Sequence, residues 1–344
     1  MIWHSKPTFS AAEEKAVARV LKSGYVSEGP TVRELEQAVA DALGVRGAVA
    51  LSSGTAALHM ALLAVGVGPR DQVILPSYVC TSVLDAIGYV GARPTVVDID
   101  PATLSIDFDA ARKALTKRAK AIVVPHLFGI PAVIERFRRL GVPVIEDAAQ
   151  AIGADYRGRP LGTWGDVGVL SFYATKLLTT GYGGMLVSRK QAHVSLARDL
   201  KAFDERGSYQ LRWHYAMSEI QAAVGLVQWK CLAAFLRKRK AIAQKYLRAV
   251  PRDWVVSPER SNFFRFLLRV PGPAGRWIKM LHRRGIEAKR PIFRPLHRYL
   301  GLDKDKFPVT ESAQRHVVSV PIYPAMTARE CAIVTAALRE LCAP

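Results

Sequence analysis

Short apolar runs alternate with segments of helical periodicity through the first half of this 344-residue chain. Runs of four to eight apolar residues are typical of buried strands, and the longer amphipathic segments are typical of the helices that follow them. The successive pairs are GAVAL and TAALHMALLAV, QVIL and SVLDAIGYV, PTVVDI and FDAARKAL, AIVVPHLF and AVIERFRRL, followed by VPVIED and VGVLSF. This alternation predicts an α/β fold with a mostly parallel sheet sandwiched by helices, and ligands then bind beyond the carboxyl ends of the strands.

Two domains are expected, because the chain is longer than one compact core usually reaches. We expect a large domain over residues 1–235 and a smaller C-terminal α/β domain over 236–344. Apolar spacing over residues 218–250 predicts one long or slightly broken helix that links them. FRFLLRV predicts a strand in the small domain, and GPAGRWIKMLHRRG and TARECAIVTAALREL predict helices.

The large domain is expected to begin with an N-terminal helical entry segment. Ser10 with Glu13, and Thr31 with Glu34, have the spacing of capping boxes and predict helices over about 11–22 and 31–43.

The cysteine and histidine spacing and the apolar runs bear on whether the chain is a disulfide-rich, metal-binding, secreted or membrane protein. The four cysteines are far apart and form no CxxC pair, and the eight histidines show no HExxH spacing, so we expect neither a disulfide framework nor a metal site. The N-terminal residues do not resemble a secretory signal, and no apolar run reaches the length of a membrane span, which predicts a soluble cytoplasmic protein.

Positive charge is concentrated in the C-terminal part. The formal net charge is +20, and residues 201–344 hold 27 Lys and Arg against 11 Asp and Glu. Such a field attracts anions of many kinds. For RKRK at 237–240 we favour a solvated helix face over a polyanion site, and for Arg283, Arg284, Lys289, Arg290 and Arg294 surface and substrate-facing positions both stay open. We expect no specific nucleic-acid binding, since no helix-turn-helix, zinc or aromatic-platform motif is present.

The turn LSSGTAAL joins a predicted strand to a helix that begins at about Thr55. Free backbone N–H groups and the positive end of the helix, around Gly54 and Thr55, favour a phosphate there. Taken alone, the turn is better explained as an ordinary strand-to-helix connection with Ser/Thr capping.

Two ionisable residues follow later strands. Asp147 comes directly after VPVIE, where a buried carboxylate needs a cation or hydrogen-bond donors; a protonated pyridine nitrogen would serve, and helix capping is the alternative. Lys176 follows VGVLSF, where an apolar floor favours its neutral, nucleophilic form. Ser171 on that strand adds a hydroxyl for a phosphate, and Gly181, Gly183 and Gly184 allow close backbone approach. Together these features describe a site for pyridoxal 5'-phosphate.

Motifs along nearly the whole chain resemble the DegT/DnrJ/StrS family of fold-type I pyridoxal phosphate enzymes, mostly aminotransferases of nucleotide-linked keto sugars. The similar segments are GPTVRELE, SSGTAAL, PHLFG, EDAAQAIGA, SFYATKLLTTGYGG, SEIQAAVGLVQ and VSVPIYPAMT. The resemblance implies that Lys176 is the Schiff-base lysine, Asp147 the partner of the pyridine nitrogen and Gln150 a neighbour of the ring hydroxyl. It also implies that Gly54, Thr55 and Ser171 bind the phosphate, and that a homodimer has its active sites at the interface.

The chain departs from the family pattern at several positions. Cys80 of PSYVCTS aligns where family members often place an aromatic ring over the cofactor, with Tyr78 as a possible substitute. His214 stands where the family has an Asn that reaches a cofactor phosphate in the neighbouring subunit. Ala216 replaces the usual Arg and Tyr182 replaces the common Glu, so the substrate side is altered more than the cofactor side.

Our leading hypothesis is transamination from an amino-acid donor, glutamate by family expectation, to a keto sugar, nucleotide-linked by the same expectation. A pyridoxal phosphate-dependent sugar dehydratase is disfavoured, because those relatives carry His at the position of Lys176. A catalytically altered member that binds a protein or polyanion through its basic face is the non-enzyme alternative. We expect His126 to pack or hydrogen-bond at a strand end, and we weigh a substrate-pocket position for His297.

Overall fold

The protein is described by a computed structural model that covers residues 1–202, 204, 207–257 and 259–342. Its centre is a seven-stranded sheet in which β9 runs antiparallel to both neighbours, β1 and β8, whereas β8, β5, β4, β2 and β3 pair in parallel. In spatial order the strands are β1 (Gly47–Leu51), β9 (Gly184–Ser188), β8 (Val167–Ser171), β5 (Val144–Asp147), β4 (Ala119–Pro125), β2 (Gln72–Pro76) and β3 (Arg93–Val97). The predicted mostly parallel sheet is confirmed.

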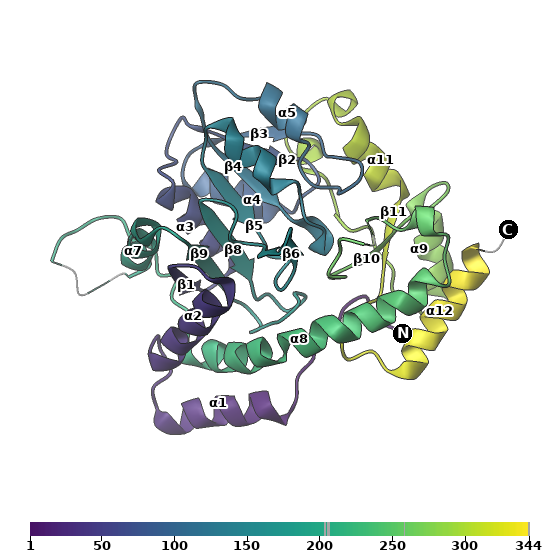
Figure 1. The fold of residues 1–344 in the computed structure, drawn as a ribbon, viewed down its shortest axis with the longest axis horizontal. Helices are drawn as coiled ribbons and strands as arrows, with labels where there is room; N and C mark the ends of the chain where they lie inside the picture. The colour runs from purple at the N-terminus through teal and green to yellow at the C-terminus, as the bar shows by residue number, and fades with distance from the viewer. Residues whose placement is uncertain (203, 205–206, 258, 343–344) are drawn as a thin grey trace.

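Helices cover both faces of this sheet, because alternate strand residues point to opposite sides. In β1, Val49 and Leu51 join the core with α3 (Gly54–Ala64), α4 (Thr81–Tyr89) and α7 (Gln191–Leu200), while Ala48 and Ala50 join the core beneath the opposite face. That second core includes residues of α2 (Pro30–Leu43), α5 (Phe108–Lys113) and α6 (Ile134–Phe137). The result is a three-layer sandwich (Figure 1).

The N-terminal helices pack on α8 (Glu219–Leu247), the long helix that crosses the lower part of Figure 1 above α1. Ser10 and Glu13 form the predicted capping box of α1 (Ala11–Ser23). The predicted Thr31 and Glu34 box is wrong: α2 begins at Pro30, and the backbone N–H groups of its first turn donate instead to the Glu219 carboxylate, at 2.9 Å from Thr31 and 2.8 Å from Val32. A carboxylate from a distant part of the chain therefore accepts the hydrogen bonds that a local N-cap side chain was expected to accept.

A separate core forms in the C-terminal part, around the antiparallel pair β10 (Phe266–Arg269) and β11 (Val317–Val320). The predicted helices α9 (Ala274–Arg283) and α12 (Ala328–Cys342) contribute to this core, whereas α10 (Leu296–Tyr299) and α11 (Pro308–His316) contribute Leu296 and Ala313 to a core of the large sheet. A short hairpin of β6 (Asp155–Tyr156) and β7 (Arg159–Pro160) lies between this part and the large sheet (Figure 1), and 3-10 turns occur at Leu127–Gly129, Arg138–Leu140, Arg252–Trp254 and Lys304–Lys306.

The basic run in α8 is only partly solvated, which corrects the expectation for RKRK. Arg237, Lys238 and Lys240 are exposed or line a groove, but Arg239 is 2% exposed and donates to the carbonyl oxygens of Phe263, Phe264 and Ile322 at 3.3, 3.2 and 2.8 Å. The guanidinium thus ties the long helix to the C-terminal core.

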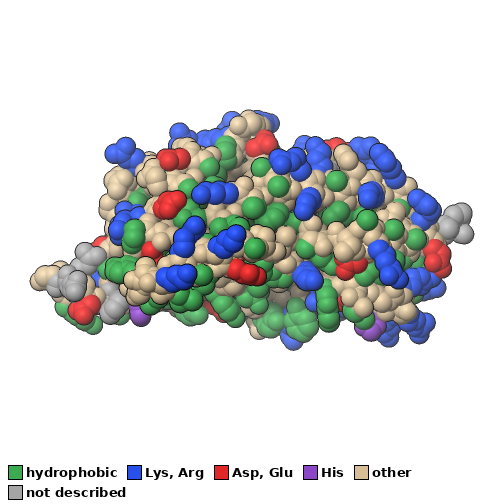
Figure 2. All heavy atoms as spheres, turned by 90° about the horizontal axis from the view of Figure 1, so that it is seen from below, with side chains coloured by type: hydrophobic (Ala, Val, Ile, Leu, Met, Phe, Trp, Pro, Cys, Tyr) green, Lys and Arg blue, Asp and Glu red, His purple; other side chains and the backbone are tan. Residues whose placement is uncertain are grey.

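Lys and Arg predominate over acidic side chains on the face seen in Figure 2. None of the helices in the described ranges is both long and apolar enough to cross a membrane.

Candidate active site

A cavity of about 380 Å³ lies at the carboxyl ends of β1, β5 and β8, where the strand order predicts a ligand site. Seven of the eight predicted cofactor residues line it: Gly54, Thr55, Cys80, Asp147, Gln150, Ser171 and Lys176. They come from four separate segments of the chain, so the fold brings together residues that the sequence only suggested were related.

The amino end of α3 forms one end of the cavity. The Ser53 hydroxyl caps the helix by accepting a hydrogen bond from the Ala56 N–H at 3.0 Å, and Gly54 and Thr55 open the first turn. A Cβ atom on Gly54 would lie 3.0 Å from the Ser171 Oγ, so only glycine lets this hydroxyl approach the turn closely. Amide N–H groups, a hydroxyl and the helix dipole are therefore directed at one place, which suits a phosphate.

Asp147 ends β5 with its side chain in the cavity, and the residue is 8% exposed. Burial raises the pKa of its carboxyl, while the Ala149 N–H, which donates to Oδ1 at 3.0 Å, and the nearby Lys176 act in the opposite direction. Asp147 does not cap a helix, because the residues after it, 149–153, form turns rather than a helix. A carboxyl group that loses hydration here is stabilised in its charged form by a cationic partner.

Lys176 lies in the loop after β8, with its side chain in the same cavity. Burial lowers the pKa of its ammonium group and nearby Arg265 acts in the same direction, against the opposing influence of Cys80 and Asp147. Its Nζ is 5.7 Å from the ring centroid of Phe264. A lowered pKa favours the neutral amine that attacks an aldehyde.

Cys80, at the start of α4, lines the cavity, whereas Tyr78 does not. Tyr78 is fully buried in the core and packs edge-on against Phe128, with ring centroids 6.1 Å apart. Of Tyr78 and Cys80, it is therefore Cys80 that lies beside the cavity, together with Val79 and Ser82 of the same segment. Gln150 also lines the cavity, and its Oε1 accepts a hydrogen bond from the Phe128 N–H at 2.7 Å, which fixes the amide.

His214 is the one predicted residue outside the cavity lining. Its side chain is exposed in the segment before α8, so it does not complete the site within a single chain.

Several lining residues were missed. Val169 and Tyr173 lie in the cavity on either side of Ser171 at two-residue spacing, and the alternation of an extended strand could have identified them. Tyr182, noted only as a departure from the family, lines the mouth and meets Tyr173 edge-to-face at 5.5 Å between ring centroids. Phe264 does not line the cavity, but its ring centroid lies 5.7 Å from Lys176 Nζ; it belongs to the C-terminal part, and no sequence pattern links it to Lys176.

Two other histidines have structural roles. His126 is buried, with Nε2 2.9 Å from Glu146 and Nδ1 accepting the Ala132 N–H at 3.0 Å, which confirms a hydrogen-bonding position at a strand end. His297 is buried between Ser77 and Glu311, outside the cavity, so the substrate-pocket position considered for it is wrong.

The residues present fit pyridoxal phosphate, because an amine, an under-solvated carboxyl and an anion-binding helix end surround one cavity. A mostly parallel sheet with such a site at its carboxyl edge defines the class of fold-type I pyridoxal phosphate-dependent aminotransferases. The model of the DegT/DnrJ/EryC1/StrS aminotransferase family matches residues 7–339, and the chain belongs to this family.

Known relatives agree with this assignment. The chain is 33% identical to GDP-perosamine synthase of Caulobacter vibrioides, over 97% of this chain and 96% of that protein. The pyridoxal phosphate form of the sugar aminotransferase Spr1654 from Streptococcus pneumoniae has a TM-score of 0.93 at 25% identity, covering 99% of this chain and 98% of that one. DesV of S. venezuelae has a TM-score of 0.90 at 31% identity, covering 97% and 95% of the two chains.

Proposed function

We propose that this aminotransferase moves an amino group from an amino-acid donor, glutamate being the expected one, to the ketone of a nucleotide-linked sugar. The observation that carries the proposal is the convergence of Lys176, Asp147 and the amino end of α3 on one cavity. The 33% identity to a GDP-perosamine synthase, sustained over 97% of the chain, supports a nucleotide-linked acceptor.

In this proposal Lys176 holds the aldehyde of the cofactor through Nζ. When an amino donor takes its place, the free Lys176 amine would be the base that moves a proton at the substrate carbon, a role that its lowered pKa favours. When bound, pyridoxal phosphate supplies the electron sink that stabilises charge on that carbon.

Burial alone raises the pKa of the Asp147 carboxyl, but a protonated ring nitrogen beside it would keep the carboxyl ionised, and the carboxylate would in turn favour the protonated nitrogen. Ser171, Gly54 and Thr55 would hold the phosphate, Gln150 would lie near the ring hydroxyl, and Cys80 would be the side chain of its segment placed to cover the ring.

Arg265 supports an acidic donor. Its guanidinium packs on the Phe264 ring with 4.5 Å between Cζ and the centroid, and Lys176 Nζ faces the same ring. The buried Nη1 of Arg265 has no hydrogen-bond partner among the described residues. Unmatched positive charge next to Lys176 favours a substrate that carries carboxylates.

We also propose a homodimer with active sites at the subunit interface. Large apolar side chains are exposed around the cavity mouth and the segment of His214: Tyr182 is 65% exposed, Tyr89 58% and Leu211 65%. An apolar surface of this kind on a soluble protein favours a partner surface. In this arrangement His214 reaches a cofactor phosphate in the partner subunit.

Mixed dimers test that arrangement. Lys176→Ala and His214→Ala chains, each inactive as a pure dimer, are co-refolded, and mixed dimers regain activity if each site takes Lys176 from one subunit and His214 from the other. A monomer in light scattering, or mixed dimers without activity, contradicts the proposal.

The domain division at 235/236 remains a proposal, and it is supported by the separate C-terminal core. It places the boundary inside α8, so the long helix belongs to both parts. Cytoplasmic localisation is proposed as well, and cell fractionation tests it.

Substrate assays test the function itself. The holoprotein is incubated with glutamate and a panel of nucleotide-linked keto sugars, and 2-oxoglutarate release is measured. Release that requires a nucleotide-linked acceptor supports the proposal. If every nucleotide sugar fails while a free cyclitol ketone reacts, the proposed acceptor class is wrong.

A further inference from the structure

Two tyrosines stand at the mouth of the cofactor cavity, and the cofactor chemistry uses neither of them. Tyr173 is 44% exposed and Tyr182 is 65% exposed, and both line the cavity. Their rings meet edge-to-face, with 5.5 Å between the ring centroids. In such a pair the ring that presents its edge keeps both of its own faces free, so a flat aromatic surface stays available at the opening.

Both rings are attached to backbone that is held in place. The Tyr173 carbonyl oxygen accepts the Lys176 N–H at 2.9 Å, so this ring belongs to the turn that carries the amine. The Tyr182 carbonyl oxygen accepts hydrogen bonds from the Thr180 hydroxyl and from Gln221 Nε2, the latter at 2.9 Å. Gln221 also completes the capping box of α8, which fixes its side chain. A tyrosine on fixed backbone loses little conformational freedom when a ligand binds, which favours its use as a binding surface.

The charge and the size of the cavity indicate which part of a substrate meets these rings. Of the lining residues in the described part of the chain, only Asp147 and Lys176 are charged, and in the proposed function both serve the cofactor. The cavity of about 380 Å³ has to hold the cofactor as well, so a nucleotide-linked acceptor extends out through the mouth. The sugar ring carries the reacting ketone and is therefore the part of the acceptor that lies beside the two tyrosines.

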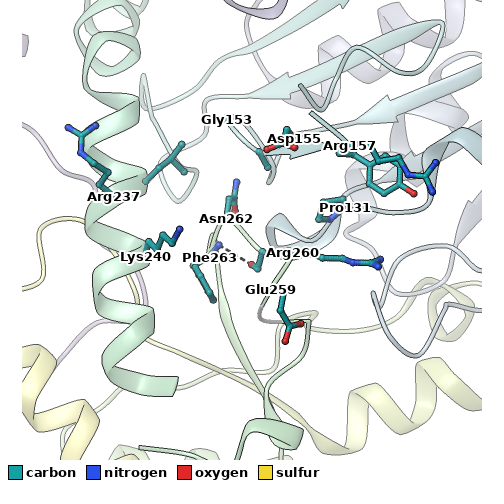
Figure 3. A pocket seen from close by; sticks show the side chains of 14 residues that line it. Pro131, Gly153, Asp155, Arg157, Arg237, Lys240, Glu259, Arg260, Asn262 and Phe263 are labelled. Atoms are coloured by element: carbon teal, nitrogen blue, oxygen red, sulfur yellow. Dashed lines mark hydrogen bonds between the residues drawn. The ribbon is translucent and has the colours of Figure 1, made fainter. Parts of the chain in front are cut away.

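A larger groove elsewhere in the molecule has no comparable surface. It measures about 630 Å³ and lies between the β6–β7 hairpin, α8 and residues 259–263 (Figure 3). Asp155 and Glu259 line it together with cations, and the guanidinium groups of Arg237 and Arg260 point away from it (Figure 3). Its aromatic lining residues are buried. The exposed aromatic surface is thus a property of the cofactor cavity.

We propose that Tyr173 and Tyr182 form a stacking platform for the sugar ring of the acceptor, with Tyr182, the more exposed of the two, as the main contact. This inference rests on the proposed transfer to a nucleotide-linked keto sugar. One face of a pyranose ring presents several C–H groups, whose slight positive charge suits the negative face of an aromatic ring. A tyrosine hydroxyl adds a donor and an acceptor for the sugar hydroxyls at the edge of that ring.

Calorimetric titration of the cofactor-loaded protein with GDP-mannose and with GDP tests the platform. GDP-mannose carries a hexose ring without the reacting ketone, so the ratio of the two affinities measures what the sugar ring contributes. We expect GDP-mannose to bind the wild type about tenfold more tightly than GDP, and the two ligands to bind Tyr182→Ala within about twofold of each other. Tyr182→Phe keeps the ring and should retain a ratio of at least about fivefold.

Tyr89→Ala is the matched control. Tyr89 is 58% exposed and belongs to the same apolar surface around the mouth, but it does not line the cavity. Its variant should keep the wild-type ratio of affinities. Cofactor absorbance shows that each variant is folded, and light scattering compares its oligomeric state with that of the wild type. Equal losses in Tyr89→Ala and Tyr182→Ala would assign Tyr182 to a subunit contact and overturn the platform.

The other contrary results are as distinct. Equal affinities of the wild type for GDP-mannose and GDP, or no binding of either, overturn the platform, and so does an unchanged ratio in Tyr182→Ala. The proposed transamination is tested apart from these titrations, by absorbance changes of the bound cofactor when glutamate is added without any acceptor. An absence of that change contradicts the proposed function, whatever the titrations show.

Discussion

Gly184, the first residue of β9, decides whether the phosphate end of the cofactor cavity keeps its shape. A Cβ atom there would lie 2.3 Å from the Ser53 carbonyl oxygen and 2.6 Å from the Gly54 nitrogen. Carbon contacts are comfortable at about 3.5 Å, so Gly184→Ala forces the turn of Ser53 and Gly54 to retreat by about 1 Å. The first N–H groups of α3 move with it.

A displacement of about 1 Å weakens phosphate binding, because the hydrogen bonds from the α3 N–H groups depend on their direction. Overpacking costs about 1–3 kcal/mol of stability, and a misplacement of about 1 Å can cost on the order of a hundredfold in function. We therefore expect Gly184→Ala to weaken the affinity of the apoprotein for pyridoxal phosphate between about tenfold and a hundredfold. Absorbance titration measures the affinity, and thermal unfolding measures the stability.

Gly88→Ala is the matched control. Gly88 lies in α4, and a methyl group added to it would meet no atom within 4 Å, so alanine should leave cofactor affinity unchanged and raise stability slightly, by about 0.5–1 kcal/mol. Wild-type affinity and stability in Gly184→Ala would refute the close-approach argument.

Three further predictions concern buried polar groups. Asp147→Asn, which keeps the shape of the side chain, should lower kcat by about a hundredfold or more in the glutamate assay while the cofactor still binds, since it removes one fixed electrostatic partner; a wild-type kcat would contradict the role of Asp147. Arg239→Met should lower the free energy of unfolding by about 3 kcal/mol in denaturant melts, because three carbonyl oxygens lose their donor, whereas Lys238→Met should change it by less than about 0.5 kcal/mol. Burial lowers the pKa of His59 to about 4, so the unfolded chain takes up a proton that the folded protein excludes, and stability falls as pH drops from about 6.5 towards 4; His59→Phe should remove this part of the acid loss, and an identical pH profile would contradict it.

The fold was predictable where local patterns decide it. Alternating apolar runs predicted the parallel strands, and apolar spacing predicted one long or slightly broken helix where α8 lies. Predictions from local patterns were wrong where a group from a distant part of the chain makes the contact. Glu219 caps α2 in place of Thr31, and Arg239 is buried because the C-terminal core offers three carbonyl oxygens, which the basic run around it could not reveal.

Some residues of the candidate site could likewise be predicted from the sequence, and others could not. Gly54, Asp147 and Lys176 each follow a strand of one sheet, and parallel strands end at one edge, so their convergence could be inferred. Phe264 and Arg265 reach the neighbourhood of Lys176 only through packing of the two cores against each other. No residue spacing in the sequence predicts the approach of Phe264 and Arg265 to Lys176. Cys80 and Tyr78 are two residues apart, and only the structure shows which of them lines the cavity.

The central claim is that Lys176 is the residue that binds the cofactor aldehyde. Purified protein is incubated with pyridoxal phosphate, reduced with borohydride and digested, and the modified peptide is identified by mass spectrometry. We predict a single phosphopyridoxyl label, on Lys176, that disappears in Lys176→Ala. A label on another lysine, or none at all, would contradict the account.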